Sequence, residues 1–194
     1  MDHAGLAIAR AVHTVTPDVS TPVLICGGPG FNGGDGLAAG RHLAGWGYPV
    51  RVIVTGRLNH LREEPAAFAR IAQALGIELR ECASAADVSG CDPWFAHAGV
   101  IVDALLGVGT QGAVREPAAS LIARMNGSGK PVVSADVPSG LDADTGHVQG
   151  IGVRAAVTVT FGLPKQGLRI ADGPAHVGSL VVDAITIPQR LLVP

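Results

Sequence analysis

The chain has 194 residues, of which 47% are hydrophobic and 15% are charged, and its formal net charge is -2. A near-neutral chain offers no basic surface of the kind that binds nucleic acid or an anionic membrane. No apolar run is long enough to span a bilayer, and the length is that of one ordinary domain.

The predicted elements alternate between helices, marked by apolar residues at helical spacing, and strands, marked by short apolar β-branched runs. In chain order we predict a helix over 4–15, a strand over 22–26, helices over 37–46 and 63–75 flanking a strand over 49–55, strands over 77–80 and 99–106, a helix over 117–125, strands over 131–135, 155–161 and 178–183, and a short helix over 187–192. The segment 83–97 gives no clear prediction. This alternation predicts an α/β fold: three layers, doubly wound, with a mostly parallel sheet.

The cysteines are Cys26, Cys82 and Cys91. Their number is odd, they form no Cys-x-x-Cys pair, and no secretory signal precedes them. We therefore expect reduced thiols and a cytoplasmic protein.

The stretch from Gly27 to Gly36 holds six glycines in ten residues, between a predicted strand and a predicted helix. Glycines there let the backbone approach a ligand and direct free N–H groups at it. A plain turn is the alternative, but it needs only one or two glycines. The stretch matches neither the dinucleotide fingerprint nor a Walker A loop, which would end in Gly-Lys-Ser/Thr. Asp35 within it favours an amide, a sugar hydroxyl or a cation over a phosphate lying directly on the loop.

Polar side chains follow several of the other predicted strands. Ligands of parallel sheets bind beyond the carboxyl ends of the strands, so these side chains are candidates to share one site with the glycine stretch. They are Asp103, followed by the glycine-containing segment 104–112, then Asp136, Ser139 and Lys165. Carboxylates at such an edge can hold a cation or transfer a proton. The alternatives are a capping or turn role for either aspartate and a solvated position for Lys165.

Together these segments resemble one family, the NAD(P)H-hydrate epimerases of the YjeF N-terminal domain type. Four motifs in order carry the resemblance over nearly the whole chain. They are Gly-Pro-Gly-Phe-Asn-Gly-Gly-Asp-Gly-Leu at 28–37, Val-Asp-Ala-Leu-Leu-Gly-Val-Gly at 102–109, Asp-Val-Pro-Ser-Gly-Leu at 136–141, and Thr160-Phe161 with Lys165 and Gly167-Leu168. The resemblance implies a Rossmann-like fold and an isomerase. Its reaction interconverts the R and S epimers of NADHX and NADPHX, the hydrated forms of the reduced nicotinamide cofactors, and so repairs damaged metabolites.

The resemblance also implies a cofactor and site residues. One potassium ion would be held by Asn32, Asp103 and Ser139. The hydrate would contact residues of two loops and one strand end: Phe31, Asn32, Gly33, Gly34, Asp35, Gly107, Val108, Gly109, Thr110, Gln111, Gly112, Ala113 and Asp136. Expelling the C6 hydroxyl as water leaves a delocalised cation, and water returning to the other face inverts the centre. We hypothesise that Asp136 is the acid/base and that Lys165 orients it or tunes its charge.

Two departures from the family pattern bear on function. Phe31 replaces the first Asn of the family's Asn-Asn pair, which gives an aromatic face that could stack on the substrate or block the pocket. The chain also begins later than is normal for the family, so we expect 1–194 to be a single domain without the family's N-terminal helical segment and without a dehydratase domain. The resemblance allows a homodimer and gives no nucleic-acid or membrane partner.

Two other functions are weighed against catalysis. One is a catalytically weakened member of the same family that binds a nucleotide-like ligand or a protein. The other is an NAD-dependent dehydrogenase, which the glycine stretch and the absence of an acid after the second strand argue against. Arg57 stands near that position and could meet a 2′-phosphate.

Overall fold

The computed structural model describes residues 1–110, 112–188 and 190. Its seven strands form one parallel sheet in the order β3-β2-β1-β4-β5-β6-β7. The strands are β1 (Val23–Gly27), β2 (Val50–Thr55), β3 (Glu78–Cys82), β4 (Val100–Ala104), β5 (Val132–Ala135), β6 (Val157–Phe161) and β7 (Ser179–Asp183). The strand order reverses between β1 and β4, which places a ligand crevice beyond the carboxyl ends of these two strands. The predicted doubly wound α/β fold is confirmed.

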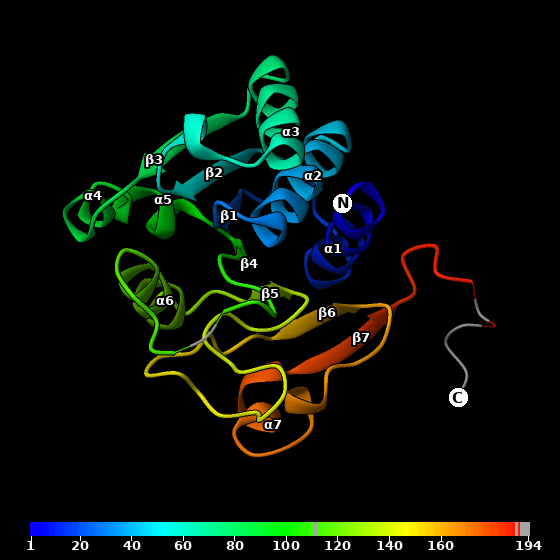
Figure 1. Ribbon diagram of the computed structural model, residues 1–194. Coiled ribbons are helices and arrows are strands. Elements are labelled where there is room, and N and C mark those ends of the chain that lie inside the picture. The colour runs from blue at the N-terminus through cyan, green and yellow to red at the C-terminus, as the bar shows by residue number, and fades with distance from the viewer. Residues whose placement is uncertain (111, 189, 191–194) are drawn as a thin grey trace.

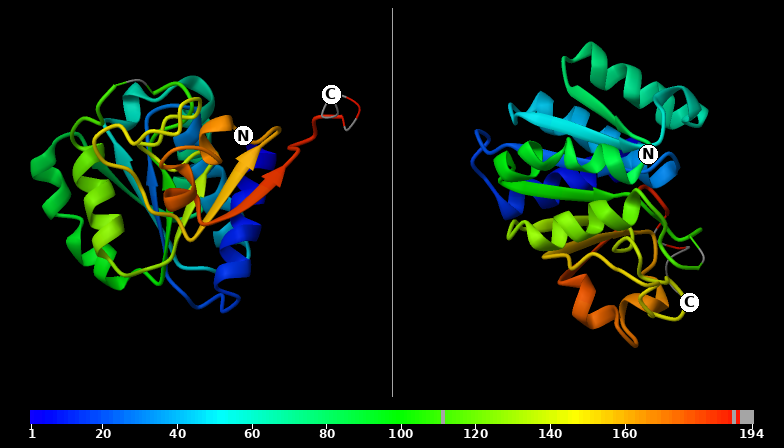
Figure 2. Two further views of the ribbon diagram at one scale, coloured as in Figure 1. Left: turned by 90° about the horizontal axis from the view of Figure 1, so that it is seen from below. Right: turned by 90° about the vertical axis from the view of Figure 1, so that its left-hand side faces the viewer.

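Helices cover both faces of the sheet, with α1, α2 and α3 on one side and α5 and α6 on the other (Figure 1). In the left view of Figure 2 the strands lie between the green helices and the blue helix α1. The helices are α1 (Asp2–Val15), α2 (Phe31–Gly45), α3 (Glu63–Ala74), α4 (Ala85–Ser89), α5 (Asp92–His97), α6 (Ala118–Gly127) and α7 (Gly173–Val177), with 3₁₀ turns at Leu58–His60 and Gln166–Leu168. None of the helices in this part of the chain combines the length and apolar character needed to cross a membrane.

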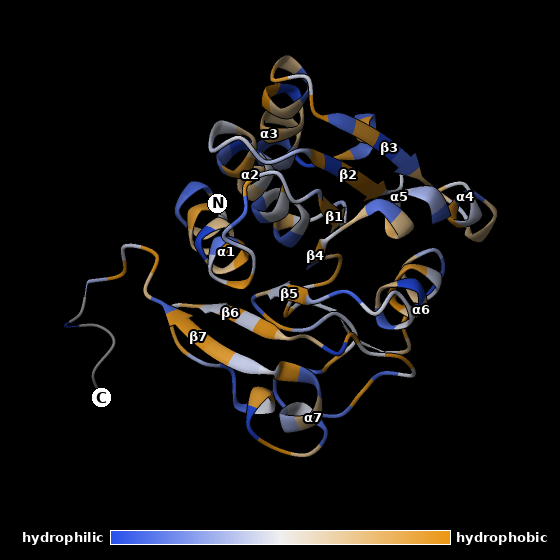
Figure 3. Ribbon diagram, turned by 180° about the vertical axis from the view of Figure 1, so that it is seen from behind, coloured by the Kyte–Doolittle hydropathy of each residue, from blue (hydrophilic) through white to orange (hydrophobic). Residues whose placement is uncertain are grey.

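Strand β1 contributes side chains to two hydrophobic cores, one on each face of the sheet. Successive side chains of a strand point to opposite faces. Val23 and Ile25 therefore join the cluster beneath α1, α2 and α3, whereas Leu24 and Cys26 join the cluster beneath α5 and α6. All four are almost fully buried. Burial on both faces explains why the strands are apolar without alternating. The edge strands differ, since β3 is mostly hydrophilic and β7 mostly hydrophobic (Figure 3).

The structure corrects several predicted boundaries. Helix α2 begins at Phe31, six residues before the predicted start, so the second half of the glycine stretch is helical. Glycine is a poor helix former, but a Cβ atom on Gly36 would lie 2.7 Å from that of Ala104, so close packing against the sheet requires it. The predicted strand over 99–106 ends at Ala104, and the unassigned segment 83–97 contains α4 and α5. Half of the helix predicted over 187–192 lies outside the described residues, and residues 187 and 188 are not helical.

Candidate functional site

A cavity of about 410 Å³ lies at the carboxyl ends of the central strands. It is formed by the start of α2, the loop after β4, the residue after β5 and the residue that precedes α3. Its described lining residues are Pro29, Gly30, Phe31, Asn32, Asp35, Arg62, Leu105, Leu106, Gly107, Val108, Gly109, Thr110 and Asp136. The structure thus brings the glycine stretch together with the loop after β4 and with Asp136.

Close backbone approach holds together the segments that surround this cavity. The N–H of Gly28 donates a hydrogen bond to the carbonyl of Ala104 at 2.9 Å. A Cβ atom on Gly28 would lie 1.9 Å from the carbonyl oxygen of Leu105, and one on Gly33 would lie 1.8 Å from the carbonyl oxygen of Gly28. No larger residue fits at either position without moving the backbone. The glycines thus pack the turn after β1 against the loop after β4.

Asp136 directly follows β5 and has a φ of 64°, which is unusual for a residue other than glycine. The N–H of Val137 donates to the carbonyl of Ala135 at 2.8 Å, which closes a rare γ-turn centred on Asp136. The N–H of Asp136 itself donates to the carbonyl of Val159 at 2.7 Å. Local strain of this kind is often found at functional sites. Here the turn places the carboxylate at the cavity wall.

Lys165 binds this carboxylate from the loop after β6. Its Nζ donates to Oδ1 of Asp136, to the hydroxyl of Thr160 at 3.2 Å and to the carbonyl of Phe161 at 2.9 Å. The same Oδ1 also accepts the N–H of Phe161 at 3.1 Å and the hydroxyl of Thr160 at 3.2 Å. The two predicted catalytic residues are thus in direct contact. Lys165 lies behind Asp136 and is not among the described residues that line the cavity.

Asp35 is the second carboxylate of the cavity, and only 16% of its side chain is exposed. Burial raises the pKa of Asp35 to about 7, and the nearby charge of Asp136 acts in the same direction. The amino group of Met1, 3.7 Å away, acts in the opposite direction but does not offset the burial. Near neutral pH this carboxyl group can therefore donate a proton.

Asn32, Asp103 and Ser139, the three predicted potassium ligands, meet around the backbone of Leu106. The amide of Asn32 donates to the carbonyl of Leu106 at 2.8 Å, and the N–H of Leu106 donates to the hydroxyl of Ser139 at 2.9 Å. Ser139 in turn donates its hydroxyl to Oδ1 and its N–H to Oδ2 of Asp103. Residues from α2, β4 and the loop after β5 are thereby joined in one network.

The donor atoms of this network suit a hard cation. Asp103 is fully buried, which raises the pKa of its carboxyl group, while hydrogen bonds from Ser139, Ser134 and the N–H of Leu105 favour the charged form. Within the described residues, no group of three or more His, Cys, Asp or Glu side chains is placed to hold a metal ion. A cation here would rely on one carboxylate with amide, hydroxyl and carbonyl oxygens, which are ligands of hard cations.

The predicted substrate-binding residues divide into two groups. The cavity is lined by Phe31, Asn32, Asp35, Gly107, Val108, Gly109, Thr110 and Asp136. Gly33, Gly34, Gly112 and Ala113 are not among its described lining residues, and Gln111 lies outside the described residues. Gly33 and Gly34 are buried in the first turn of α2, where they allow close packing rather than form the cavity wall.

Arg62 is the lining residue that the sequence did not suggest. It precedes α3, and its guanidinium carbon lies 4.9 Å from the centre of the Phe31 ring. No motif marks it, and only its place in the loop after β2 could have drawn attention to it. Arg57, the arginine that the sequence suggested for a 2′-phosphate, instead pairs with Glu81 at 3.3 Å and is not among the described lining residues.

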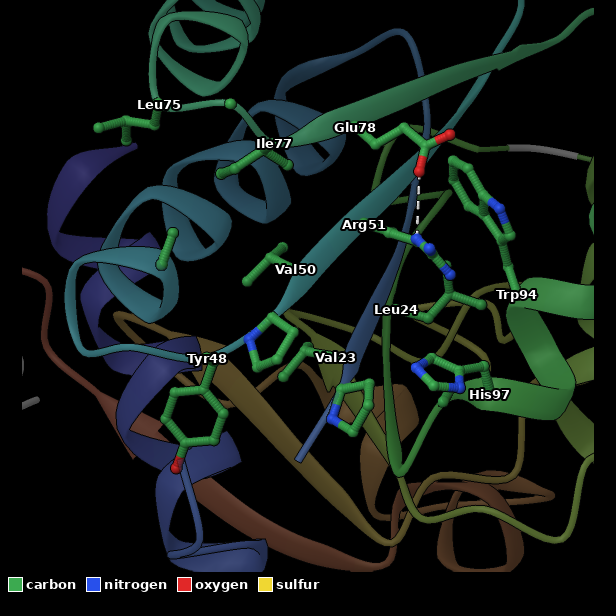
Figure 4. Close-up of a pocket in the computed structure, with 15 residues that line it drawn as sticks. Val23, Leu24, Tyr48, Val50, Arg51, Leu75, Ile77, Glu78, Trp94 and His97 are labelled. Atoms are coloured by element: carbon green, nitrogen blue, oxygen red, sulfur yellow. Dashed lines mark ion pairs between the residues drawn. The ribbon is translucent and has the colours of Figure 1, made fainter. Parts of the chain in front are cut away.

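A second cavity of about 430 Å³ lies at the amino ends of β1, β2 and β3 (Figure 4). Its lining includes the ion pair between Arg51 and Glu78, at 3.2 Å, and the indole of Trp94, over which Arg51 lies. These charged side chains are already paired with each other. The slightly smaller cavity at the carboxyl ends combines two carboxylates and a strained turn with the neighbouring Asp103 network, so it is the candidate functional site.

Comparisons with known proteins show which proteins the chain is similar to. A family model described as YjeF-related protein N-terminus matches residues 1–167. The bifunctional NAD(P)H-hydrate repair enzyme Nnr of Pyrobaculum aerophilum is 44% identical over 98% of this chain, and the NAD(P)H-hydrate epimerase of Limosilactobacillus fermentum is 36% identical over 94%. The chain spans 38% of the first relative and 83% of the second. The crystal structure of the yeast protein YNL200c aligns with 97% of this chain and 79% of its own, with a TM-score of 0.82 and 26% identity.

Proposed function

The chain belongs to the family of YjeF-related N-terminal domains, and from this premise we propose that it is an NAD(P)H-hydrate epimerase. Its substrates would be the R and S epimers of hydrated NADH and NADPH. The names of the relatives support this proposal. The observation that carries it is the contact between Lys165 and Asp136 at the wall of a cavity that also holds the largely buried carboxyl group of Asp35.

The reaction needs an acid and a base near C6 of the hydrated ring. We infer that the protonated carboxyl of Asp35 gives its proton to the C6 hydroxyl, so that the carbon–oxygen bond breaks and water leaves. The positive charge then spreads over C6 and the ring nitrogen. A water molecule attacks C6 from the other face and loses a proton to the Asp136 carboxylate. Two carboxyl groups of different protonation suit this exchange, and the reverse reaction uses them in exchanged roles.

Lys165 serves this chemistry through Asp136. Its ammonium group compensates the charge of the carboxylate and fixes Oδ1, together with Thr160 and Phe161. Among the described residues, every hydrogen bond to this carboxylate ends on Oδ1. Oδ2 is therefore available for the attacking water, and its carboxylate charge favours the cationic intermediate.

We also propose that Asn32, Asp103 and Ser139 hold one potassium ion. These residues fit such an ion because their carboxylate, amide and hydroxyl groups belong to one hydrogen-bonded network with the backbone of Leu106. When bound, the ion would supply positive charge that fixes the start of α2 against the loops after β4 and β5. Potassium is a weak Lewis acid, so the acid/base chemistry stays with the aspartates.

The proposal includes the setting in which the protein works. Cys26, Cys82 and Cys91 are free and buried, which supports a reducing compartment, and we propose the cytoplasm. We propose hydrated NADH and NADPH as its small-molecule partners, with no nucleic-acid or membrane partner. A homodimer stays a prediction.

The decisive experiment is R-to-S epimerisation of NADHX by the purified chain, measured with and without potassium. We expect acceleration well above the spontaneous rate, and a higher rate in potassium than in sodium. Failure to accelerate the reaction, combined with tight binding of the hydrate, would instead support the alternative of a binding domain that has lost turnover. Failure of both would contradict the assignment of the cavity.

A further inference from the structure

Arg62 and Phe31 form a pair at the cavity that comes from two separate elements. Phe31 begins α2 and is 50% exposed, and Arg62 precedes α3. The guanidinium carbon lies 4.9 Å from the ring centre, within the range of a cation–π contact. Both residues line the cavity. The ring thus supports the guanidinium at the cavity wall.

Arg62 differs from the other cationic side chains near the cavity because no described carboxylate pairs with it. Among the described lining residues it is the one cationic side chain, and it shares the cavity with Asp35 and Asp136. Lys165 is engaged by Asp136 and Arg57 by Glu81. In the part of the chain that the structure describes, no carboxylate forms an ion pair with Arg62.

A nucleotide substrate carries groups that the cationic side chain of Arg62 could bind. Its phosphate groups are anionic, and Arg62 is the one cationic side chain among the described residues that line the cavity which must take up the hydrated ring. Because no described carboxylate forms an ion pair with Arg62, its charge is available to a phosphate group. A guanidinium group supported through its face keeps its edge N–H groups free, and these match two phosphate oxygens.

Building on the proposed function, we propose that Arg62 binds a phosphate group of the nucleotide substrate. Phe31 is then a positioning residue that holds the guanidinium in place. This assigns a use to the residue that departs from the family motif, since the aromatic ring would support Arg62 rather than stack on the substrate or block the pocket.

The first test compares Arg62→Gln with the wild-type protein on NADHX, NADPHX and a phosphate-free substrate, hydrated 1-methyl-dihydronicotinamide. We expect the KM for NADHX to rise about 10- to 100-fold with kcat within about threefold, because a charged hydrogen bond made throughout the reaction is lost. The kcat/KM for the phosphate-free substrate should not change. Equal rises in the KM for NADHX and for NADPHX would identify the diphosphate as the group that Arg62 binds. A rise confined to NADPHX would identify the 2′-phosphate. Unchanged KM values for both nucleotides would overturn the proposal.

Three further variants test the pair. Arg57→Gln is the matched control, since Arg57 pairs with Glu81, and it should leave every KM unchanged. Phe31→Leu removes the ring face and should raise the KM for NADHX by less than Arg62→Gln does. Phe31→Tyr keeps the ring and should restore the wild-type KM. A Phe31→Leu variant with the wild-type KM would contradict the positioning role.

A binding measurement separates this proposal from the proposed function. ADP-ribose carries the diphosphate and has no ring to epimerise, so its affinity can be measured by calorimetry whether or not the chain is an enzyme. We expect Arg62→Gln to weaken its binding about 10- to 100-fold. Epimerisation by the wild type with an ADP-ribose affinity that does not depend on Arg62 overturns only the contact with the diphosphate. Affinity that depends on Arg62 in a chain without turnover overturns only the proposed function.

Discussion

Nζ of Lys165 donates a hydrogen bond to Oδ1 of Asp136, 29 residues earlier in the chain. Thr160 and Phe161 donate to that same oxygen, so all the hydrogen bonds that the described residues give to this carboxylate end on one side of it. The other oxygen belongs to a side chain at the wall of the cavity. A carboxylate held in this way has a fixed orientation and one atom left for chemistry.

Asp136→Asn tests the role of that atom. The amide retains an oxygen that can accept from Lys165, but it cannot take a proton from water. We expect kcat for NADHX epimerisation to fall about 10²- to 10⁴-fold, as is typical when a general acid or base is lost. Circular dichroism and thermal unfolding of the variant should resemble the wild type. Epimerisation at the wild-type rate would exclude Asp136 as the base.

Lys165→Met tests the contribution of the ammonium group behind the carboxylate. Lys165 is not among the described residues that line the cavity, so we expect kcat to fall about 10- to 100-fold with little change in KM. Lys130→Met is the matched control, because Lys130 is the only other lysine and stands before β5, at the opposite end of the strand from Asp136. A rise in KM without loss of kcat would show instead that Lys165 contacts the substrate.

Asp35→Asn tests the proton donor through pH. The pKa of Asp35 is raised to about 7, so its carboxyl group is protonated below neutral pH and ionised above it. We expect the wild-type rate to fall as the pH rises through 7, and the variant to be slow and to lack this change between about pH 6 and 8. A wild-type rate that is flat across this range would contradict the assignment.

The raised pKa of Asp35 also makes the stability of the folded protein depend on pH. A raised pKa means that the folded protein favours the protonated carboxyl, whose contribution to stability is complete below the ordinary value of 3.8 and is lost as the pH rises through about 7. Asn is neutral at every pH. Asp35→Asn should therefore raise the melting temperature more at about pH 8.5 than at about pH 5.5.

Gly33→Ala tests the close packing at the start of α2. Alanine normally stabilises a helix relative to glycine, but here its Cβ atom would lie 1.8 Å from the carbonyl oxygen of Gly28. Since the clash is with backbone, we expect a loss of at least about 3 kcal/mol in the free energy of unfolding. Gly45→Ala at the end of the same helix meets nothing within 4 Å and should be neutral or stabilising. Denaturant unfolding of the two variants measures the difference.

The sequence predicted the convergence of Asp103, Asp136 and Ser139 because the carboxyl ends of parallel strands share one edge of a sheet. It could not predict where α2 begins. Glycine weakens a helix by its own propensity, and only the distance between Gly36 and Ala104 shows why tertiary packing overrides that preference. The boundary at Phe31 is therefore a property of the assembled sheet.

The sequence could not predict that Arg62 belongs to the site, for a related reason. Its partner, Phe31, belongs to another element, and no spacing along the chain relates the two residues. The protonation of Asp35 likewise depends on burial by the rest of the cavity. Motifs thus predicted where the candidate site lies, whereas the protonation of its carboxyl groups depends on the tertiary structure around them.

Potassium binding can be tested without turnover by thermal unfolding in potassium and sodium chloride at equal ionic strength. An ion that binds only the folded protein raises its melting temperature with concentration, so we expect the wild type to be more stable in potassium. Ser139→Ala removes one proposed ligand and should abolish this difference. Ser134→Ala is the matched control, since Ser134 also donates to Asp103 but is not a proposed ligand. Both variants lose a buried hydrogen bond, so only the difference between the two salts separates a ligand from a structural residue. Equal melting temperatures of the wild type in the two salts would leave the Asp103 network a purely structural joint between β4 and the loop after β5.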